Sequence, residues 1–256
     1  MRKISLLIVS VVITLVLAGA MCVSKTKKQA DARSFAGKGF VLMELFTSQG
    51  CSSCPPADEL LGKYVKSNDA RIIPLSFHVD YWNRLGWTDP FSNNKFTSRQ
   101  GNYATRFSLE SVYTPQMIIN GRQQMTGSDE ESISNIIDQY LKEPVSATIS
   151  IAGIDNAAGK LTVTYDLSED MPGSHINAAL VLLQSTTAIK AGENKGAMLT
   201  NYNVVRDFAS AAATGKSGSC SLQLPVGANA KDYKVVLYAQ EDGPGKITCA
   251  TQSAVH

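Results

Sequence analysis

Two apolar runs separated by an amphipathic segment open the folded part of the chain. Residues 39–46 (GFVLMELF) and 70–82 (ARIIPLSFHVDYW) are apolar over the length of a strand, which predicts two buried β-strands. Between them, residues 55–68 start with two prolines and then repeat leucine, tyrosine and valine at helical spacing. Because proline fits the first positions of a helix, this segment predicts a helix that begins directly after a pair of cysteines.

The pattern continues with a second helix, a hairpin and a third helix. Residues 93–109 carry aromatic side chains on one helical face, and residues 128–141 repeat isoleucine at helical spacing. Two short runs flank Asn120–Gly121, a dipeptide typical of two-residue hairpin turns. The order strand, helix, strand, helix, strand, strand, helix predicts an α/β domain over residues 39–143.

The second half of the chain has a different pattern. Short β-like runs bounded by Gly, Asn or Asp follow one another: SATISIAG, KLTVTYDL, INAALVLLQST, NYNVVRDF, CSLQLP, YKVVLYAQ and KITCATQ. Runs of this kind predict a mostly antiparallel, sandwich-like β domain over residues 144–256. We therefore expect an α/β domain followed by an appended β domain.

The N-terminus has the composition of an export signal. Two basic residues precede an uncharged apolar run, and residues 18–20 (AGA) offer a cleavage site, so residues 1–20 are predicted to be a signal peptide. The alternatives are an uncleaved membrane anchor, since the apolar run nearly reaches the length of a membrane span, and lipid attachment at Cys22. Residues 21–38 are predicted to be a linker, and the protein to be secreted or periplasmic, with a membrane tether in the anchored case.

The charge of the chain argues against one class of partner. The chain has 24 basic and 22 acidic residues, and removal of the signal peptide, which holds two basic residues and no acidic ones, leaves 22 of each. A net charge of zero implies no basic face, so nucleic acid is not expected as a partner. We expect no cofactor.

Five cysteines in an exported chain leave several options for disulfides. Cys51 and Cys54 are close enough in the sequence to pair with each other. Cys220 and Cys249 remain as a second pair, for which we expect a structural disulfide. Cys22 is the odd cysteine if it survives cleavage.

The C-x-x-C motif at the start of a helix suits disulfide exchange. The positive end of the helix dipole and free backbone N–H groups favour a thiolate on Cys51, which would attack, while Cys54 would resolve the mixed disulfide. Pro55 and Pro56 have no N–H to offer and the first turn is acidic, so Cys51 is expected to be less acidic than its counterpart in strongly oxidising proteins. Two alternatives remain: a binding module with a purely structural disulfide, and a periplasmic carrier of copper or another soft metal that also uses His78.

The segment 39–143 resembles the thioredoxin fold in its element order. Proteins of that fold place a cis-proline opposite the C-x-x-C pair, and Thr114–Pro115 is the matching position. TPQMIINGR is also similar to a segment of glutaredoxins, which implies that the backbone of Thr114 pairs with a bound peptide or with glutathione.

Gly127-Ser128-Asp129 resembles the glutaredoxin segment that holds the γ-glutamyl end of glutathione. This resemblance gives Ser128 and Asp129 a substrate-binding role. The alternative is a helix cap, because Ser128 and Glu131 have the spacing of a capping box.

Four longer stretches point to a narrower resemblance. ELFTSQGCSSCPPAD, FHVDYWNRLGWTDPF, VYTPQMIING and ENKGAMLTNYNVVRDF are similar to a family of exported bacterial proteins, the domain-of-unknown-function family 1223. The resemblance spans nearly the whole chain after the signal peptide. It implies a thioredoxin-like domain with an appended β domain, and it supplies no substrate.

Further candidates for the site lie on the two predicted strands. Glu44, seven residues before Cys51, is a candidate buried acid that shuttles the proton of the resolving thiol; the alternative is an acid that points to solvent. His78, Asp80 and Trp82 lie at the carboxyl end of the second strand, where α/β sites open, and are candidates for lining a substrate groove. The sequence thus predicts an exported thiol-disulfide oxidoreductase whose partners are protein thiols or disulfides, with glutathione as a further candidate.

Overall fold

The computed structural model describes Phe35 and residues 37–256, and the predicted signal peptide, Cys22 and most of the predicted linker lie outside the described residues. Of the described residues, 42% lie in strands and 19% in helices, so the protein is mostly β. The elements are β1 (Val41–Thr47), α2 (Pro55–Lys66), β2 (Ile72–His78), η1 (Asn83–Leu85), α3 (Asn94–Arg106), β3 (Gln116–Ile119), β4 (Gln123–Thr126), α4 (Glu130–Tyr140), β5 (Ile149–Ala157), β6 (Lys160–Leu167), β7 (Ser174–Ala188), β8 (Met198–Ala212), β9 (Ser217–Gln223), η2 (Ala230–Asp232), β10 (Tyr233–Glu241) and β11 (Ile247–Ala254). Among these elements, no helix has the length and apolar character needed to cross a membrane.

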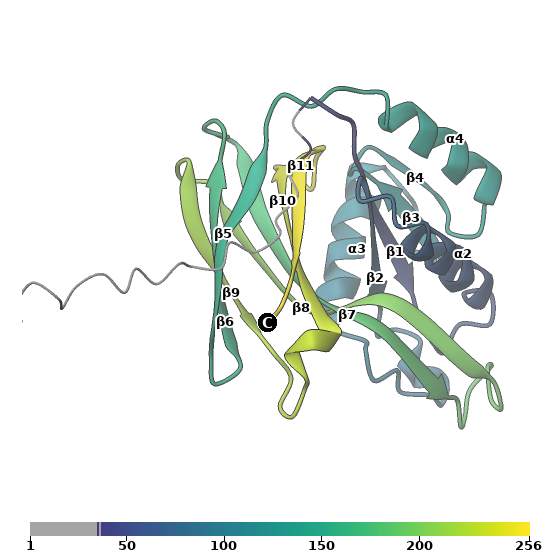
Figure 1. Cartoon of the computed structure of the whole chain (residues 1–256). Helices are drawn as coiled ribbons and strands as arrows, with labels where there is room; N and C mark the ends of the chain where they lie inside the picture. Colours follow the sequence, from purple (N-terminus) through teal and green to yellow (C-terminus); the bar gives the residue numbers. More distant parts are fainter. Residues whose placement is uncertain (1–34, 36) are drawn as a thin grey trace, which may run out of the picture.

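Eight strands form one mixed sheet that runs across the molecule (Figure 1). Their order is β11-β10-β7-β8-β2-β1-β3-β4. β1 and β2 pair in parallel, and β8 continues the sheet at the other edge of β2 through the parallel pair Ser76 and Val204. The predicted hairpin at Asn120–Gly121 is confirmed: both turn residues have positive φ, and the hairpin strands are β3 and β4.

The predicted fold class, a thioredoxin-like α/β domain with an appended sandwich-like β domain, is wrong. β7, β8, β10 and β11 come from the segment 144–256, yet they belong to the same sheet as the strands of the segment 39–143. The physical reason lies at β2, where every residue from Ile73 to His78 is buried. A buried strand needs partners for its N–H and C=O groups at both edges, and β8 provides them at the second edge through the pair Ser76 and Val204 and the side chain of Asn203. The apolar runs predicted individual strands but not the partner of each strand.

A second sheet, in the order β5-β6-β9, packs over the half of the large sheet that contains β7, β10 and β11. Alternate side chains of β6 are buried in this interface, as expected for a strand with one face on a core: Leu161, Val163, Tyr165 and Leu167. Cys220 of β9 and Cys249 of β11 lie in the same core as free thiols, so the structural disulfide predicted between them is wrong. The two strands belong to different sheets, and the thiols pack there as small apolar groups.

The three α-helices of the described residues cover the other half of the large sheet, on opposite faces. α2 and α4 pack on one face, against Val41 and Met43 of β1, whereas α3 packs on the other face, against Leu42 and Phe46. Because side chains alternate along a strand, Glu44 points to the face that α3 covers. The sheet therefore separates Glu44 from the helix that the cysteine pair begins.

β7 and β8, with 15 residues each, form a long hairpin. Figure 1 shows the outer part of this hairpin, in green, extending past the end of the sheet on the side of α2. We call the turn between the two strands, residues 189–197, the hairpin tip. The tip contacts the loop that carries Cys51, although the two segments are about 140 positions apart in the sequence.

Candidate functional site

The loop between β1 and α2 holds a disulfide between Cys51 and Cys54. Cys54 is the N-cap of α2, and the two predicted prolines occupy the first helical positions. Both cysteines are buried, whereas Ser52 and Ser53 between them are exposed. The Cα atoms of the two cysteines are 5.4 Å apart, so the disulfide closes a small ring at the positive end of the helix dipole.

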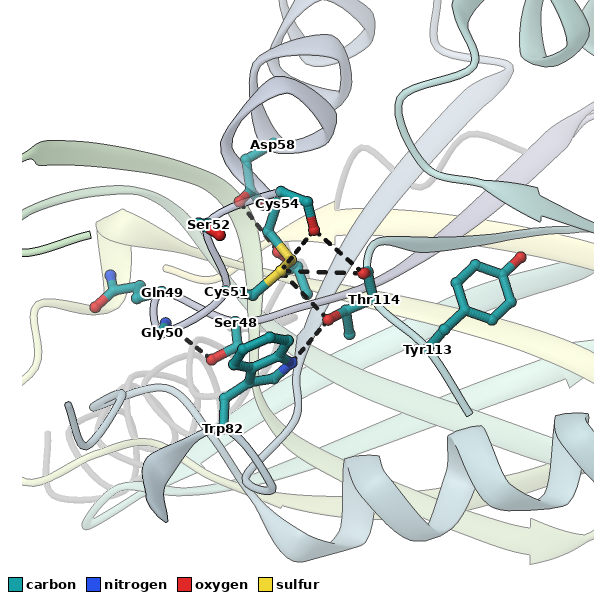
Figure 2. The surroundings of a disulfide bond; sticks show 12 residues. Ser48, Gln49, Gly50, Cys51, Ser52, Cys54, Asp58, Trp82, Tyr113 and Thr114 are labelled. Atoms are coloured by element: carbon teal, nitrogen blue, oxygen red, sulfur yellow. Dashed lines mark hydrogen bonds between the residues drawn. A yellow bond between two sulfur atoms is a disulfide. The ribbon is translucent and has the colours of Figure 1, made fainter. Parts of the chain in front are cut away.

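The loop between α3 and β3 contacts the sulfur of Cys51. The Thr114–Pro115 peptide bond is cis, and the carbonyl oxygen of Thr114 lies 4.0 Å from Cys51 Sγ. The Thr114 hydroxyl donates to Cys51 Sγ at 3.4 Å and accepts a hydrogen bond from the Trp82 indole N–H at 2.8 Å (Figure 2). Trp82 therefore orients the hydroxyl toward the sulfur. The predicted residues Cys51, Thr114, Pro115 and Trp82 lie together in the folded chain.

The hairpin tip binds the other side of the cysteine loop. The carboxylate of Glu193 accepts a hydrogen bond from the backbone N–H of Ser52 at 3.0 Å. The side-chain amide of Asn194 donates to the carbonyl oxygens of Gln49 and Cys51, both at 2.9 Å. The hydrogen bond from Ser52 lowers the pKa of Glu193, so this side chain carries a negative charge next to Cys51 at neutral pH.

Asp58 is a buried acid one helical turn after Cys54 (Figure 2). Its backbone N–H donates to the carbonyl of Cys54, so the two side chains lie on the same face of α2. The Thr47 hydroxyl donates to Asp58 Oδ2 at 3.1 Å; Asn201 lies beside the carboxyl, but Oδ1 makes no hydrogen bond of normal geometry within the described part of the chain. Burial, only partly offset by His78, raises the pKa of Asp58 to about 7.

His78, the last residue of β2, and Asp89 form a buried pair next to the cysteine loop. His78 Nδ1 lies 2.6 Å from Asp89 Oδ2, and the same oxygen accepts the backbone N–H of Gln49 at 2.8 Å. Burial acts to lower the pKa of His78, but the attraction of Asp89 outweighs it and leaves the pKa above its ordinary value. The positive charge of His78 also favours ionisation of Asp58. His78 is thus a buried partner of two acids rather than a residue that lines an open groove.

The remaining predicted residues lie elsewhere. Glu44 is fully buried and binds Arg99 and the hydroxyls of Tyr103 and Tyr238 on the α3 side of the sheet, so it does not approach the disulfide. Asp80 accepts a hydrogen bond from Thr97 at 2.6 Å and thereby joins the end of β2 to α3.

The predicted capping box of Ser128 with Glu131 is not formed. Asp129 is the N-cap of α4, and its side chain accepts the backbone N–H of Ser132 at 3.1 Å. A capping box would need Ser128 at the N-cap position, but α4 begins at Glu130, so Asp129 occupies that position instead. Ser128 and Asp129 are both exposed.

Among the described residues, no group of three or more His, Cys, Asp or Glu side chains is arranged to hold a metal ion. His78, the third ligand of the soft-metal alternative, is bonded to Asp89 instead. This arrangement gives the carrier hypothesis no added support.

Sequence reasoning missed Asp58 and the hairpin tip. The sequence identified this acid only as part of an acidic first turn, yet Cys54, Ala57, Asp58 and Leu61 have the i, i+3, i+4, i+7 spacing of one buried helical face. That spacing is the signal that identifies Asp58 as buried. The tip carried no comparable signal, because nothing in Glu193 or Asn194 alone indicates contact with a distant loop.

The fold and the site define a mostly β protein whose mixed sheet presents a C-x-x-C disulfide at the start of a helix, beside a cis-proline. The chain belongs to the family described as Protein of unknown function (DUF1223), whose family model matches residues 42–240. The family predicted from the sequence motifs is therefore confirmed.

Two solved structures are similar to the chain. One is the crystal structure of a protein from Agrobacterium tumefaciens, which is 30% identical; the match covers 86% of this chain and 95% of that chain, with a TM-score of 0.65. The other is HBP35 of Porphyromonas gingivalis, which is 14% identical; the match covers 86% of this chain and 76% of that chain, with a TM-score of 0.62, and shows a similar fold only. No curated protein matches the chain.

Proposed function

We propose that this protein performs thiol-disulfide exchange with other proteins. The observation that carries the proposal is the setting of Cys51 Sγ, which accepts a hydrogen bond from the Thr114 hydroxyl while Cys54 lies within bonding distance at the helix start. A hydroxyl that donates to the sulfur stabilises the thiolate formed on reduction, and the helix dipole does the same. These are the requirements of an attacking thiol and its resolving partner.

The exchange would proceed in two steps. In the reduced protein, the Cys51 thiolate attacks one sulfur of a partner disulfide, a mixed disulfide forms, and the other partner sulfur leaves as a thiolate. Cys54 then loses its proton and attacks Cys51 Sγ, which re-forms the Cys51–Cys54 disulfide and releases the second partner sulfur as a thiolate. Two electrons pass to the partner disulfide, and the reverse sequence oxidises a partner dithiol.

Asp58 is the proposed acceptor of the Cys54 proton. Its carboxyl lies one turn from Cys54 on the same face of α2, and its pKa of about 7 suits proton transfer near neutral pH. A buried acid whose pKa is raised by burial is a typical feature of a functional site. This assignment gives Asp58 the role that the sequence had suggested for Glu44.

A partner must open the cysteine loop before it reaches Cys51, because neither cysteine has exposed surface in the oxidised protein. Glu193 and Asn194 hold that loop through three hydrogen bonds. The hairpin tip would therefore control both the access to the disulfide and the charge beside it.

The proposal places the protein outside the cytoplasm, on the basis of the signal peptide predicted at residues 1–20. Its partners would be protein thiols or disulfides. Glutathione is a separate candidate that rests on the resemblance of Ser128 and Asp129, and turnover with glutathione in wild type but not in Ser128→Ala would support it.

Trapping of a partner tests the exchange. We expect the Cys54→Ser protein to form a mixed disulfide with a model disulfide substrate and to hold it, because the resolving thiol is absent. The Cys51→Ser protein, the matched control, should trap nothing. We also expect the Cys51–Cys54 couple to have a reduction potential well above about −300 mV, the upper range of structural disulfides. Failure of Cys54→Ser to trap substrate, together with a potential at or below that value, would favour the binding module with a structural disulfide.

A further inference from the structure

A cavity of about 670 Å³ lies at the opposite end of α2 from the disulfide. It is bounded by the last turn of α2, by β2 and β8, and by β10 and β11. A helix of 12 residues spans about 18 Å, so this cavity is distinct from the site at Cys51. Its volume falls within the range of small-molecule sites, roughly 300–1,000 Å³.

The cavity lies beside the short ladder between β2 and β8. Their ladder consists of the single pair Ser76 and Val204. Pro74, two residues earlier on β2, has no N–H to donate to β8. The side-chain amide of Asn203 donates to the carbonyl of Pro74 at 2.8 Å, which satisfies that group without a ladder hydrogen bond.

Lys234 of β10 brings an unneutralised positive charge to this cavity. Its ammonium donates to the side-chain oxygen of Gln252 at 3.0 Å, and no carboxylate in the described part of the chain forms an ion pair with it. Asp69 also lines the cavity, but its carboxylate is bound by the guanidinium of Arg71 through two hydrogen bonds. Burial lowers the pKa of Lys234 to about 8, a shift that an anionic neighbour would reverse.

The other walls combine apolar and aromatic surface with two more lysines. Leu183 and Tyr202 contribute apolar area, and Leu183 is 41% exposed, so its side chain is open to a ligand. Lys66 and Lys231 also line the cavity, and the Lys66 ammonium lies 4.8 Å from the centre of the Tyr202 ring. The site therefore offers aromatic walls around a region of positive potential.

We propose that this cavity binds a small aromatic carboxylate, with the carboxylate on Lys234 and the ring against Tyr202. Lys234 is the most enclosed of the three lysines at the cavity and can pair with one negative charge. The apolar walls suit a ring better than a second charged group. A bound carboxylate would supply the counter-charge that the described residues do not give to Lys234. The proposal is independent of the exchange chemistry at Cys51.

Calorimetric titration of the purified chain with phenylacetate and with phenylacetamide, its neutral counterpart of similar shape, tests the proposal. We expect phenylacetate to bind at least tenfold more tightly than phenylacetamide. The Lys234→Met protein should lose at least tenfold in phenylacetate affinity and leave phenylacetamide affinity unchanged. The matched control is Lys160→Met, which removes an exposed lysine of β6 and should bind phenylacetate as wild type does.

Three results would overturn the proposal: no binding of phenylacetate at millimolar concentration, equal affinity for the two compounds, or unchanged phenylacetate affinity in Lys234→Met. The comparison of the two compounds uses wild-type protein alone, so it decides the matter even where the Lys234 variant does not fold. Phenylacetate affinity should also fall as the pH rises above the range in which Lys234 is protonated.

Discussion

Replacement of Asp58 by asparagine is expected to stabilise the protein above pH 7 and to remove part of the pH dependence of its stability. Burial raises the pKa of the Asp58 carboxyl from 3.8 to about 7 in the folded protein, whereas the unfolded chain keeps the ordinary value. Each pKa unit corresponds to about 1.4 kcal/mol. The ionised carboxylate therefore costs the folded state about 4 kcal/mol, which is a large fraction of a typical free energy of unfolding.

The sign of the effect follows from proton binding. At a pH well below 3.8, the carboxyl is protonated in both states and its burial carries no penalty from ionisation. Between 3.8 and about 7, the unfolded chain has released its proton and the folded protein has not, so the free energy of unfolding falls as the pH rises. Above that range the loss is constant. Asparagine has no proton to lose and still accepts a hydrogen bond from Thr47, so Asp58→Asn should exceed wild type by up to about 4 kcal/mol at about pH 8.

Urea unfolding of the oxidised protein between about pH 4 and about pH 8 measures this difference. The control is Asp166→Asn, which removes an exposed acid of β6 and should reproduce the wild-type curve. Parallel curves for wild type and Asp58→Asn across this range would refute the reasoning, because they would mean that Asp58 ionises normally in the folded protein. In the reduced protein, the same substitution should slow the proposed resolution step, because Cys54 would lose its proposed proton acceptor.

Three further outcomes are expected. Glu193→Gln should speed the reduction of the disulfide by dithiothreitol several-fold, because it weakens one contact of the cysteine loop and removes a negative charge beside Cys51; an unchanged rate would contradict the role of the hairpin tip. Arg99→Met should lower the free energy of unfolding by about 3–5 kcal/mol, because it leaves the buried Glu44 carboxylate without its cation. Part of that loss should return in the double variant with Glu44→Gln, as urea unfolding would show. The free thiols of β9 and β11 should both resist maleimide in the folded oxidised protein and react once it is unfolded, whereas resistance after unfolding would indicate a disulfide between them.

The sequence predicted the local elements well where local chemistry determines them. The apolar run of β1, the prolines that begin α2 and the Asn120–Gly121 turn each act over a few residues, and each forms the expected element. The partner of β2 was not predictable in the same way. Its second edge is filled by β8, about 130 positions later, and an apolar run indicates that a strand is buried but not which strand lies beside it.

The same contrast between local and long-range information holds for the residues of the candidate site. Cys51, Cys54, Thr114 and Pro115 were identified from short motifs, and the structure places Thr114 against Cys51. Glu44 was chosen because it lies on the strand that leads into the cysteine loop, but the alternation of side chains along β1 directs it to the face of the sheet opposite α2. Sequence proximity was a poor guide there, and helical periodicity would have identified Asp58.

The contact between the hairpin tip and the cysteine loop has a consequence for how the chain is made. Synthesis proceeds from the N-terminus, so Cys51 and Cys54 emerge long before Glu193 and Asn194, which later hold their loop. Until the last third of the chain has emerged, the cysteine loop lacks these hydrogen bonds and β2 lacks its neighbour β8. During that interval the nascent chain presents two cysteines beside an unpaired strand edge, and the hairpin that later restrains their loop emerges more than 100 residues after them.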